Sequence, residues 1–165
     1  MNMDTAFFQP SGKSSLQTYL PKFLKNQSVI LVHNVHTTEA DLLFSKLPPD
    51  SNRDVNCPLY WCLCPNANQY ITGQLPDIDL LMKHDCDIVL GTDSLASNHQ
   101  LSILEEIKTI QKRFPHFELG TMLKWGTSNG ARALQMDSLL GSFERGKKPG
   151  VVLINKDSFS AKRLI

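Results

Sequence analysis

Short apolar runs alternate with amphipathic segments over most of the chain. Residues 28–33, 59–64 and 87–91 form runs rich in β-branched, aromatic and other apolar residues, and polar residues follow each of them. Runs of this length and composition predict buried β-strands. The segments between them carry apolar residues at helical intervals and begin with residues that cap helices. The predicted helices cover residues 37–44, 77–83 and 101–114, with two shorter ones at 119–125 and 128–136.

The order of these elements is strand, helix, strand, helix, strand, helix, repeated at the spacing of about 30 residues that is typical of βαβ units. This order predicts an α/β fold with a parallel sheet covered by helices. A helical segment at 16–24, interrupted at Pro21, precedes the first strand, and Pro48-Pro-Asp-Ser-Asn52 ends the first long helix. Residues 141–150 are rich in turn formers and lead to a further strand at 151–154, so we expect the chain to leave the α/β layer there.

Composition narrows the class of protein. The 165 residues are 41% hydrophobic, which is enough for the core of one domain. The 17 basic and 16 acidic side chains nearly cancel, which argues against a disordered chain and against a dedicated nucleic-acid binder. The sequence has no apolar run of about 18 residues and no secretory signal at its start. We therefore expect a cytoplasmic protein that acts away from nucleic acids and membranes.

The cysteine content agrees with a reducing compartment. Cys57, Cys62, Cys64 and Cys86 are too sparse for a disulfide scaffold, and they contain no Cys-x-x-Cys pair. Cys62 and Cys64 lie two apart on a predicted strand, so their side chains share a face in a geometry that does not favour a bridge. We predict buried free thiols.

Polar side chains follow each predicted strand at its carboxyl end. The first strand is followed by His33-Asn-Val-His36, the second by Cys64-Pro-Asn-Ala-Asn68, and the third by Gly91-Thr-Asp-Ser94. Ligands of parallel α/β folds collect at the carboxyl ends of strands. We therefore expect one convergent site that includes His33 and Asp93. A carboxylate in such a site is suited to hold a divalent metal or to take a proton from water.

Each of these residues also has a structural alternative. His33 can be a core histidine bonded to the backbone, and Asp93 can cap the next segment. The amides of Asn66 and Asn68 can fix a turn after the second strand. His36 follows His33 by three residues, which on a strand is the opposite face, so it can be a loop residue.

Taken with Gly91-Thr-Asp-Ser-Leu-Ala-Ser-Asn98 and residues 141–150, these stretches resemble the amidohydrolase superfamily, and most of all its chlorohydrolase and purine-type deaminase branch. The resemblance implies the carboxyl-terminal part of a metal-dependent (β/α)8 barrel, containing its sixth to eighth strands and their helices. That part would be residues 1–140, and residues 141–165 would belong to the flanking β element. Pro149-Gly150 stands where the closing element of the family usually has Ala-Asp.

The resemblance also implies roles for single residues. Asp93 matches the eighth-strand aspartate, which binds the metal and shuttles the proton of the attacking water. His33 matches the sixth-strand histidine, which orients that water or polarises the substrate. The implied cofactor is zinc or another divalent metal, and the implied substrate is a small molecule with a ring amine or halide. The residues expected to border the substrate are Asn66, Asn68, Ser94 and His36.

Two metal-binding motifs of the family, the first-strand His-x-His pair and the fifth-strand His-x-x-Glu, have no counterpart ahead of the first predicted strand. Without them the chain does not supply four zinc ligands. We therefore expect a fragment that is inactive alone and whose open sheet edges favour association with itself or with a missing amino-terminal half. The alternatives are a self-contained α/β module that binds a ligand without catalysis and the structural subunit of a split hydrolase.

Overall fold

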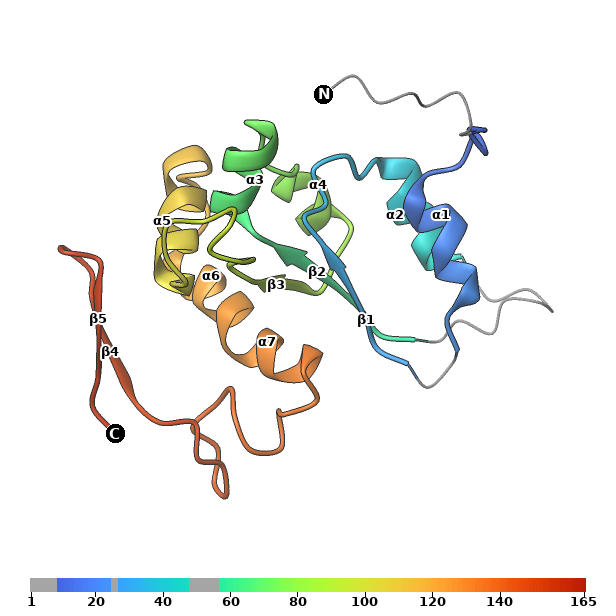
Figure 1. The fold of residues 1–165 in the computed structure, drawn as a ribbon. Helices are drawn as coiled ribbons and strands as arrows, with labels where there is room; N and C mark the ends of the chain where they lie inside the picture. The colour runs from blue at the N-terminus through green and yellow to red at the C-terminus, as the bar shows by residue number, and fades with distance from the viewer. Residues whose placement is uncertain (1–8, 25–26, 48–56) are drawn as a thin grey trace.

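The centre of the computed structural model is a sheet of three parallel strands (Figure 1). In sheet order these are β1 (Val29–Val32), β2 (Leu59–Leu63) and β3 (Ile88–Leu90). The predicted α/β class and the parallel order of the strands are confirmed. The structure describes residues 9–24, 27–47 and 57–165, so the predicted break at 48–52 lies outside the described residues.

Helices flank these strands, and all of them except α3 agree with the predicted ones to within a few residues. Several of them begin at a polar side chain that accepts a free N–H group of the first turn: Thr38 and Asp41 form a capping box, and Asp77 and Ser102 cap two later helices. The helices are α1 (Ser15–Tyr19), the 3-10 helix η1 (Leu20–Lys22), α2 (Glu39–Lys46), α3 (Pro65–Thr72), α4 (Ile78–Lys83), α5 (Ile103–Arg113), α6 (Leu119–Gly126) and α7 (Ser128–Ala133).

Alternating side chains place the two faces of the sheet in different surroundings. Trp61 and Leu63 lie on the face that forms the main core, where residues of α2, α4, α5 and α6 pack against them. Tyr60 and Val89 lie on the opposite face, where Ala133 of α7 packs against them. The sheet is therefore covered on both faces at β2 and β3, and β1 and β3 are its two edge strands.

A helix, α3, follows the second strand where the sequence also allows a turn. Pro65 occupies the first helical turn, where its missing N–H costs nothing because no intrahelical acceptor is available there. Asn66 and Asn68 are therefore helical residues, and the interpretation of their amides as turn-fixing groups is wrong. Gly73 ends the helix in the left-handed conformation, with φ of 71°.

The end of the chain forms a separate antiparallel hairpin of β4 (Val152–Asn155) and β5 (Ser160–Arg163). β4 matches the predicted strand, whereas β5 was not predicted because Ser-Ala-Lys-Arg has no apolar alternation. Phe159 in the connecting turn packs against the main core, and the ammonium of Lys108 on α5 lies 5.8 Å from its ring centre. The hairpin is thus fastened to the α/β layer through α5.

Cys62, Cys64 and Cys86 carry free thiols, as predicted. Cys57 and Cys64 are buried as predicted, whereas Cys62 and Cys86 are partly exposed. Among the residues that the structure describes, no helix has the length and apolar character needed to span a bilayer.

Candidate active site

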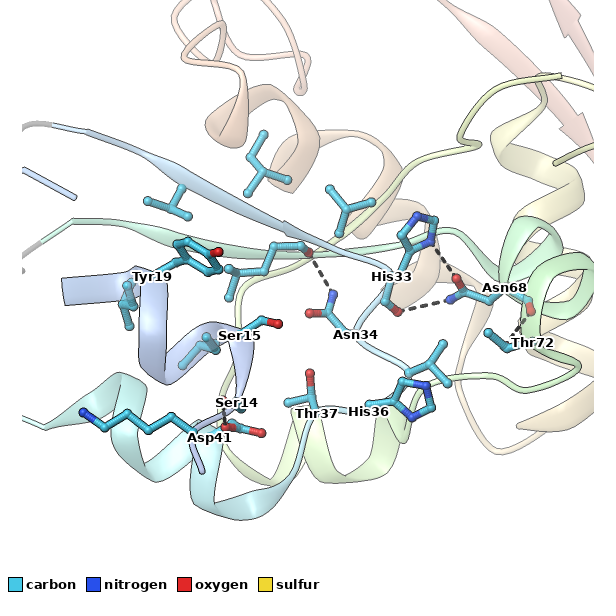
Figure 2. A pocket seen from close by; sticks show the side chains of 18 of the residues that line it. Ser14, Ser15, Tyr19, His33, Asn34, His36, Thr37, Asp41, Asn68 and Thr72 are labelled. Carbon is cyan, nitrogen blue, oxygen red and sulfur yellow. Dashed lines mark hydrogen bonds between the residues drawn. The ribbon is translucent and has the colours of Figure 1, made fainter. Parts of the chain in front are cut away.

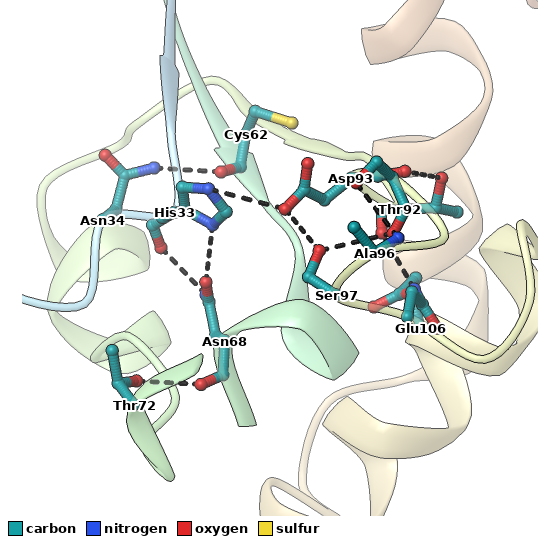
Figure 3. Close-up of polar contacts among 12 residues, drawn as sticks. His33, Asn34, Cys62, Asn68, Thr72, Thr92, Asp93, Ala96, Ser97 and Glu106 are labelled. Atoms are coloured by element: carbon teal, nitrogen blue, oxygen red, sulfur yellow. Dashed lines mark hydrogen bonds and ion pairs between the residues drawn. The ribbon is translucent and has the colours of Figure 1, made fainter. Parts of the chain in front are cut away.

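The carboxyl ends of the three parallel strands bring His33, the start of α3 and Asp93 together (Figure 3). His33 directly follows β1, α3 follows β2 after a single residue, and Asp93 lies in the loop after β3. The register places these strand ends side by side, so residues far apart in the chain become neighbours. The predicted convergence of His33 and Asp93 is confirmed.

The backbone at the end of β1 takes a conformation that residues other than glycine rarely adopt. His33 and Asn34 have φ of 73° and 59°. Hydrogen bonds to the neighbouring strand hold them there, because the His33 N–H and the Asn34 Nδ2 both donate to the carbonyl of Cys62, at 3.0 and 3.1 Å. Asn34 Nδ2 also donates to the Leu31 carbonyl at 2.8 Å. Strained backbone of this kind is concentrated at functional sites of proteins.

The orientation of the His33 ring is set by Asn68 on α3. The Asn68 amide nitrogen donates to the His33 carbonyl at 3.1 Å, which leaves the amide oxygen as an acceptor. That oxygen lies 2.7 Å from Nδ1 of His33, so Nδ1 carries the proton and donates it to Asn68. When the imidazole is neutral, its Nε2 on the other side of the ring is therefore unprotonated. Asn68 is only 2% exposed, so this pairing is shielded from water.

Asp93 also has a left-handed backbone, with φ of 57°, and its carboxylate is fixed within its own loop. The Ser97 hydroxyl donates to Oδ2 at 2.7 Å. Together with the Ser94 backbone N–H, and with a smaller contribution from His33, it holds the pKa of Asp93 below its usual range. The side chain is therefore an anion at neutral pH.

The Nε2 atom of His33 faces Oδ2 of Asp93 at 3.9 Å, and both side chains are partly exposed. This separation is too long for a direct hydrogen bond. When the imidazole is neutral, a nitrogen lone pair and a carboxylate oxygen thus face one another across a gap that is open to solvent. Such a pair can bind and orient a water molecule or another proton donor between them, and either group can then accept its proton.

A buried carboxylate that the sequence interpretation missed lies behind these residues. Glu106 on α5 is 0% exposed, and it accepts hydrogen bonds from the Asn66 backbone N–H at 2.8 Å and from the Asn98 amide at 2.7 Å. A signal for it exists in the sequence, because Glu106 falls on the apolar stripe of its helix with Ile103, Ile107 and Ile110. An acidic residue in a buried stripe needs partners.

The remaining sequence-predicted residues lie around the pair rather than within it. The Asn66 amide faces Glu106 and Thr109, so it points away from His33 and Asp93. Ser94 is exposed next to Asp93, and its hydroxyl accepts the Ala96 N–H at 3.3 Å. His36 is exposed in the loop after β1.

A cavity of about 850 Å³ opens beside β1, on the side of His33 that faces α1 (Figure 2). Its wall includes apolar side chains of α1, η1 and β1. His33, His36 and Asn68 belong to its wall, whereas Asp93 does not. The His33 ring therefore stands between this cavity and the carboxylate.

The donor atoms present do not fit a zinc ion by themselves. Within the described ranges, no group of three or more His, Cys, Asp or Glu side chains is placed to hold a metal. A catalytic zinc uses three protein ligands and one water. Here Asp93 and Nε2 of His33 supply two donors at most.

Comparisons with known proteins agree with this arrangement. Residues 9–163 match the amidohydrolase family. The chain is 32% identical to the 5-methylthioadenosine/S-adenosylhomocysteine deaminase of Thermoanaerobacter pseudethanolicus over 157 residues, which is 91% of this chain and 34% of that protein. It is 27% identical over 140 residues to the 5'-deoxyadenosine deaminase of Methanococcus vannielii, covering 81% of this chain and 31% of that protein. The chain thus spans about a third of the length of these relatives.

Solved structures show the same relationship. An adenosine deaminase from Xanthomonas campestris with bound zinc superimposes with a TM-score of 0.60 at 27% identity, over 74% of this chain and 28% of that one. The aminofutalosine deaminase of Helicobacter pylori in complex with methylthio-coformycin gives a TM-score of 0.63 at 22% identity, over 82% and 31% of the two chains, and supports the fold alone.

Proposed function

The chain belongs to the amidohydrolase family, and from this membership we propose that it forms the carboxyl-terminal part of the catalytic site of a metal-dependent deaminase. The substrate class is a small molecule with an amino group on a purine-like ring. Relatives named as deaminases of adenosine-type nucleosides support this assignment.

The observation that carries the proposal is the pair formed by His33 and Asp93. Hydrolytic deamination needs a water that loses a proton as it attacks the ring carbon, and a group that receives this proton. The ionised carboxylate of Asp93 is suited to receive it. His33, with Nδ1 bonded to Asn68, directs its Nε2 lone pair into the same gap and is suited to orient the water or the substrate.

Within this proposal, β1, β2 and β3 are the sixth, seventh and eighth strands of a (β/α)8 barrel. Residues 1–140 form the partial barrel, and residues 141–165 form part of the flanking β element. The parallel order of the three strands and the separate hairpin of β4 and β5 support this division.

A divalent metal, zinc by analogy with the zinc-bound neighbour, completes the site in the proposal, and Asp93 is the ligand that this chain contributes. The other ligands come from outside the described residues. We therefore propose that the chain is inactive alone and that it functions together with a polypeptide that carries the remaining ligands, or in association with itself. We place this activity in the cytoplasm, where the free thiols would persist.

The residues assigned to the substrate differ in how free they are to reach it. Ser94 and His36 are exposed near the pair and are proposed to contact the substrate. Asn68 is proposed to act through His33, since both ends of its amide are bonded to that residue. Asn66 is proposed to act through Glu106.

The experiment is a chimera in which residues 9–163 replace the matching third of the Thermoanaerobacter pseudethanolicus deaminase. We expect ammonia release from 5-methylthioadenosine, and we expect its loss in Asp93→Asn. The isolated chain, given zinc and the same substrate, should show no turnover. A chimera that folds and binds zinc but releases no ammonia contradicts the proposed chemistry. Turnover by the isolated chain contradicts the proposed incompleteness.

A further inference from the structure

Two separate segments hold the groups that face one another at the site. Helix α3 carries Asn68, which orients His33, and the loop from Gly91 to Asn98 carries Asp93. The main chain does not link these segments directly, because α4 and β3 lie between them. The sheet brings their starting points together, because the Gly91 N–H donates to the Leu63 carbonyl at 2.9 Å. Beyond that backbone bond, side-chain contacts join α3 to the rest of the loop.

The first contact joins Glu106 of α5 to the start of α3. Its Oε2 accepts the backbone N–H of Asn66 at 2.8 Å, and its Oε1 accepts the Asn66 amide nitrogen at 3.0 Å. The first turn of a helix leaves its N–H groups without intrahelical acceptors. Cys64, the residue that precedes α3, provides no side-chain acceptor for them. Glu106 thus caps α3 from another helix, and its negative charge lies at the favourable end of the helix dipole.

The second contact joins the same carboxylate to the loop of Asp93. Oε1 of Glu106 accepts the Asn98 amide nitrogen at 2.7 Å, and that nitrogen also donates to the carbonyl of Thr92 at 2.8 Å. Thr92 directly precedes Asp93. Asn98 is 8% exposed, so water competes little for these bonds.

The contacts favour the charged form of Glu106, although burial raises its pKa overall. Burial raises the pKa of Glu106, and the donors on Asn66 and Asn98 oppose that effect. Every one of these partners is an N–H group that donates a hydrogen bond, so the carboxylate form satisfies them all. A neutral glutamine of the same size would direct an NH2 group at one of the donors.

We propose that Glu106 is a positioning residue, which anchors α3 and the Asp93 loop to one buried carboxylate and thereby sets how His33 and Asp93 face one another. This inference rests on the proposed function and gives it a structural basis. It can be tested without measuring turnover, because the tautomer of the His33 ring reports how the ring is held (Figure 3).

The test uses the full chain and the tautomer of His33. Long-range ¹H–¹⁵N correlation spectra, recorded where the imidazole is neutral, distinguish a proton on Nδ1 from one on Nε2. A His33→Gln variant identifies the His33 signals among those of the 5 histidines. We expect one Nδ1–H form in the unmodified chain and a mixture of both forms in Glu106→Gln. Glu105→Gln is the matched control, because Glu105 is the neighbouring residue and pairs with Lys108 instead. It should leave the single form unchanged.

Variants that cut one link at a time keep the test decisive if Glu106→Gln does not fold. Asn66→Ala removes the side-chain link to α3, and we expect it to alter the His33 tautomer. Asn98→Ala removes the link to the loop, and we expect it to shift the signals of Asp93 and Ser97 while His33 keeps its single form. A folded Glu106→Gln with the spectrum of Glu105→Gln overturns the proposal. The proposal is also overturned if Asn66→Ala leaves the His33 tautomer unchanged and Asn98→Ala leaves the signals of Asp93 and Ser97 unchanged.

Discussion

The His33 Nε2 and the Asp93 Oδ2 face one another at 3.9 Å, although neither side chain is placed by its own strand alone. Asn68 holds the first through Nδ1, and Ser97 holds the second through a hydroxyl. His33 and Asp93 also have a left-handed backbone. The gap between them is therefore a product of contacts from several elements, and single changes in those contacts should be measurable.

Replacing Asn68 should release the His33 ring. Asn68→Ala removes the acceptor of Nδ1 and the donor to the His33 carbonyl at a position that is 2% exposed. Leaving buried partners unsatisfied costs about 1–3 kcal/mol. We expect the free energy of unfolding, measured in urea, to fall by that amount. Gln69→Ala, at an exposed position on the same helix, serves as the control and should change it little. Equal stability of the two variants would show that the pairing contributes nothing.

A larger residue in place of Gly91 should lower the free energy of unfolding. A Cβ there would come within 2.9 Å of the Cys62 sulfur and 3.4 Å of the Cys64 sulfur. Overpacking of this kind costs about 1–3 kcal/mol, so Gly91→Ala should lower the urea midpoint. Adding Cys62→Ala should restore part of the loss, because it removes the nearer sulfur. Gly120→Ala on α6, where nothing lies within 4 Å, should be neutral or stabilising.

Much of the fold follows from local pattern, and the parts that do not have identifiable physical reasons. The strands were predictable because they are short apolar runs, and a run such as Ile88–Leu90 is buried on both faces of the sheet. Helix α3 was missed because Pro65 is typical both of a turn and of a first helical turn. The choice between these depends on Glu106, whose contact with Asn66 joins residues far apart in the chain. Contacts of this kind leave no local signal beyond an acidic residue in an apolar stripe.

The candidate site, too, could be predicted only in part from local sequence pattern. The strand-end rule was sufficient to bring His33 and Asp93 together. It did not show that Asn66 points away from them, because that depends on the helical phase of α3. The Ser97 hydroxyl bonds to an Asp93 whose backbone is left-handed. A sequence gives little indication of this conformation at a residue other than glycine.

Acidification should loosen α1 from α2. The Asp41 carboxylate joins the two helices, since the Ser14 hydroxyl and the Gln17 amide donate to it along with groups of Thr38. Burial by itself would raise the pKa of Asp41, but these hydrogen bonds outweigh it and hold the pKa below the ordinary 3.8.

A lowered pKa of a carboxyl group gives stability that is present above the ordinary pKa and is lost as the pH falls through the lowered one. We therefore expect the unfolding free energy to drop below about pH 4. In Asp41→Asn this part of the drop should be absent, and the variant should be less stable at neutral pH. Urea titrations at several pH values measure both. Asp157→Asn, in the exposed hairpin turn, should retain the pH dependence of the unmodified chain.

The open edge of β1 should make the chain associate. Ile30 and Val32 are 38% and 50% exposed, and they lie on a strand whose other edge is paired with β2. Exposed apolar edge strands favour pairing with other chains. We expect the mass measured by light scattering to rise with concentration. Val32→Lys should return it to that of one chain of 18.5 kDa, because a charged side chain at an edge opposes pairing. Met82→Lys, on α4 at 38% exposure, changes the charge equally and should leave association intact. A constant monomer mass at all concentrations would restrict the proposed partner to a different polypeptide.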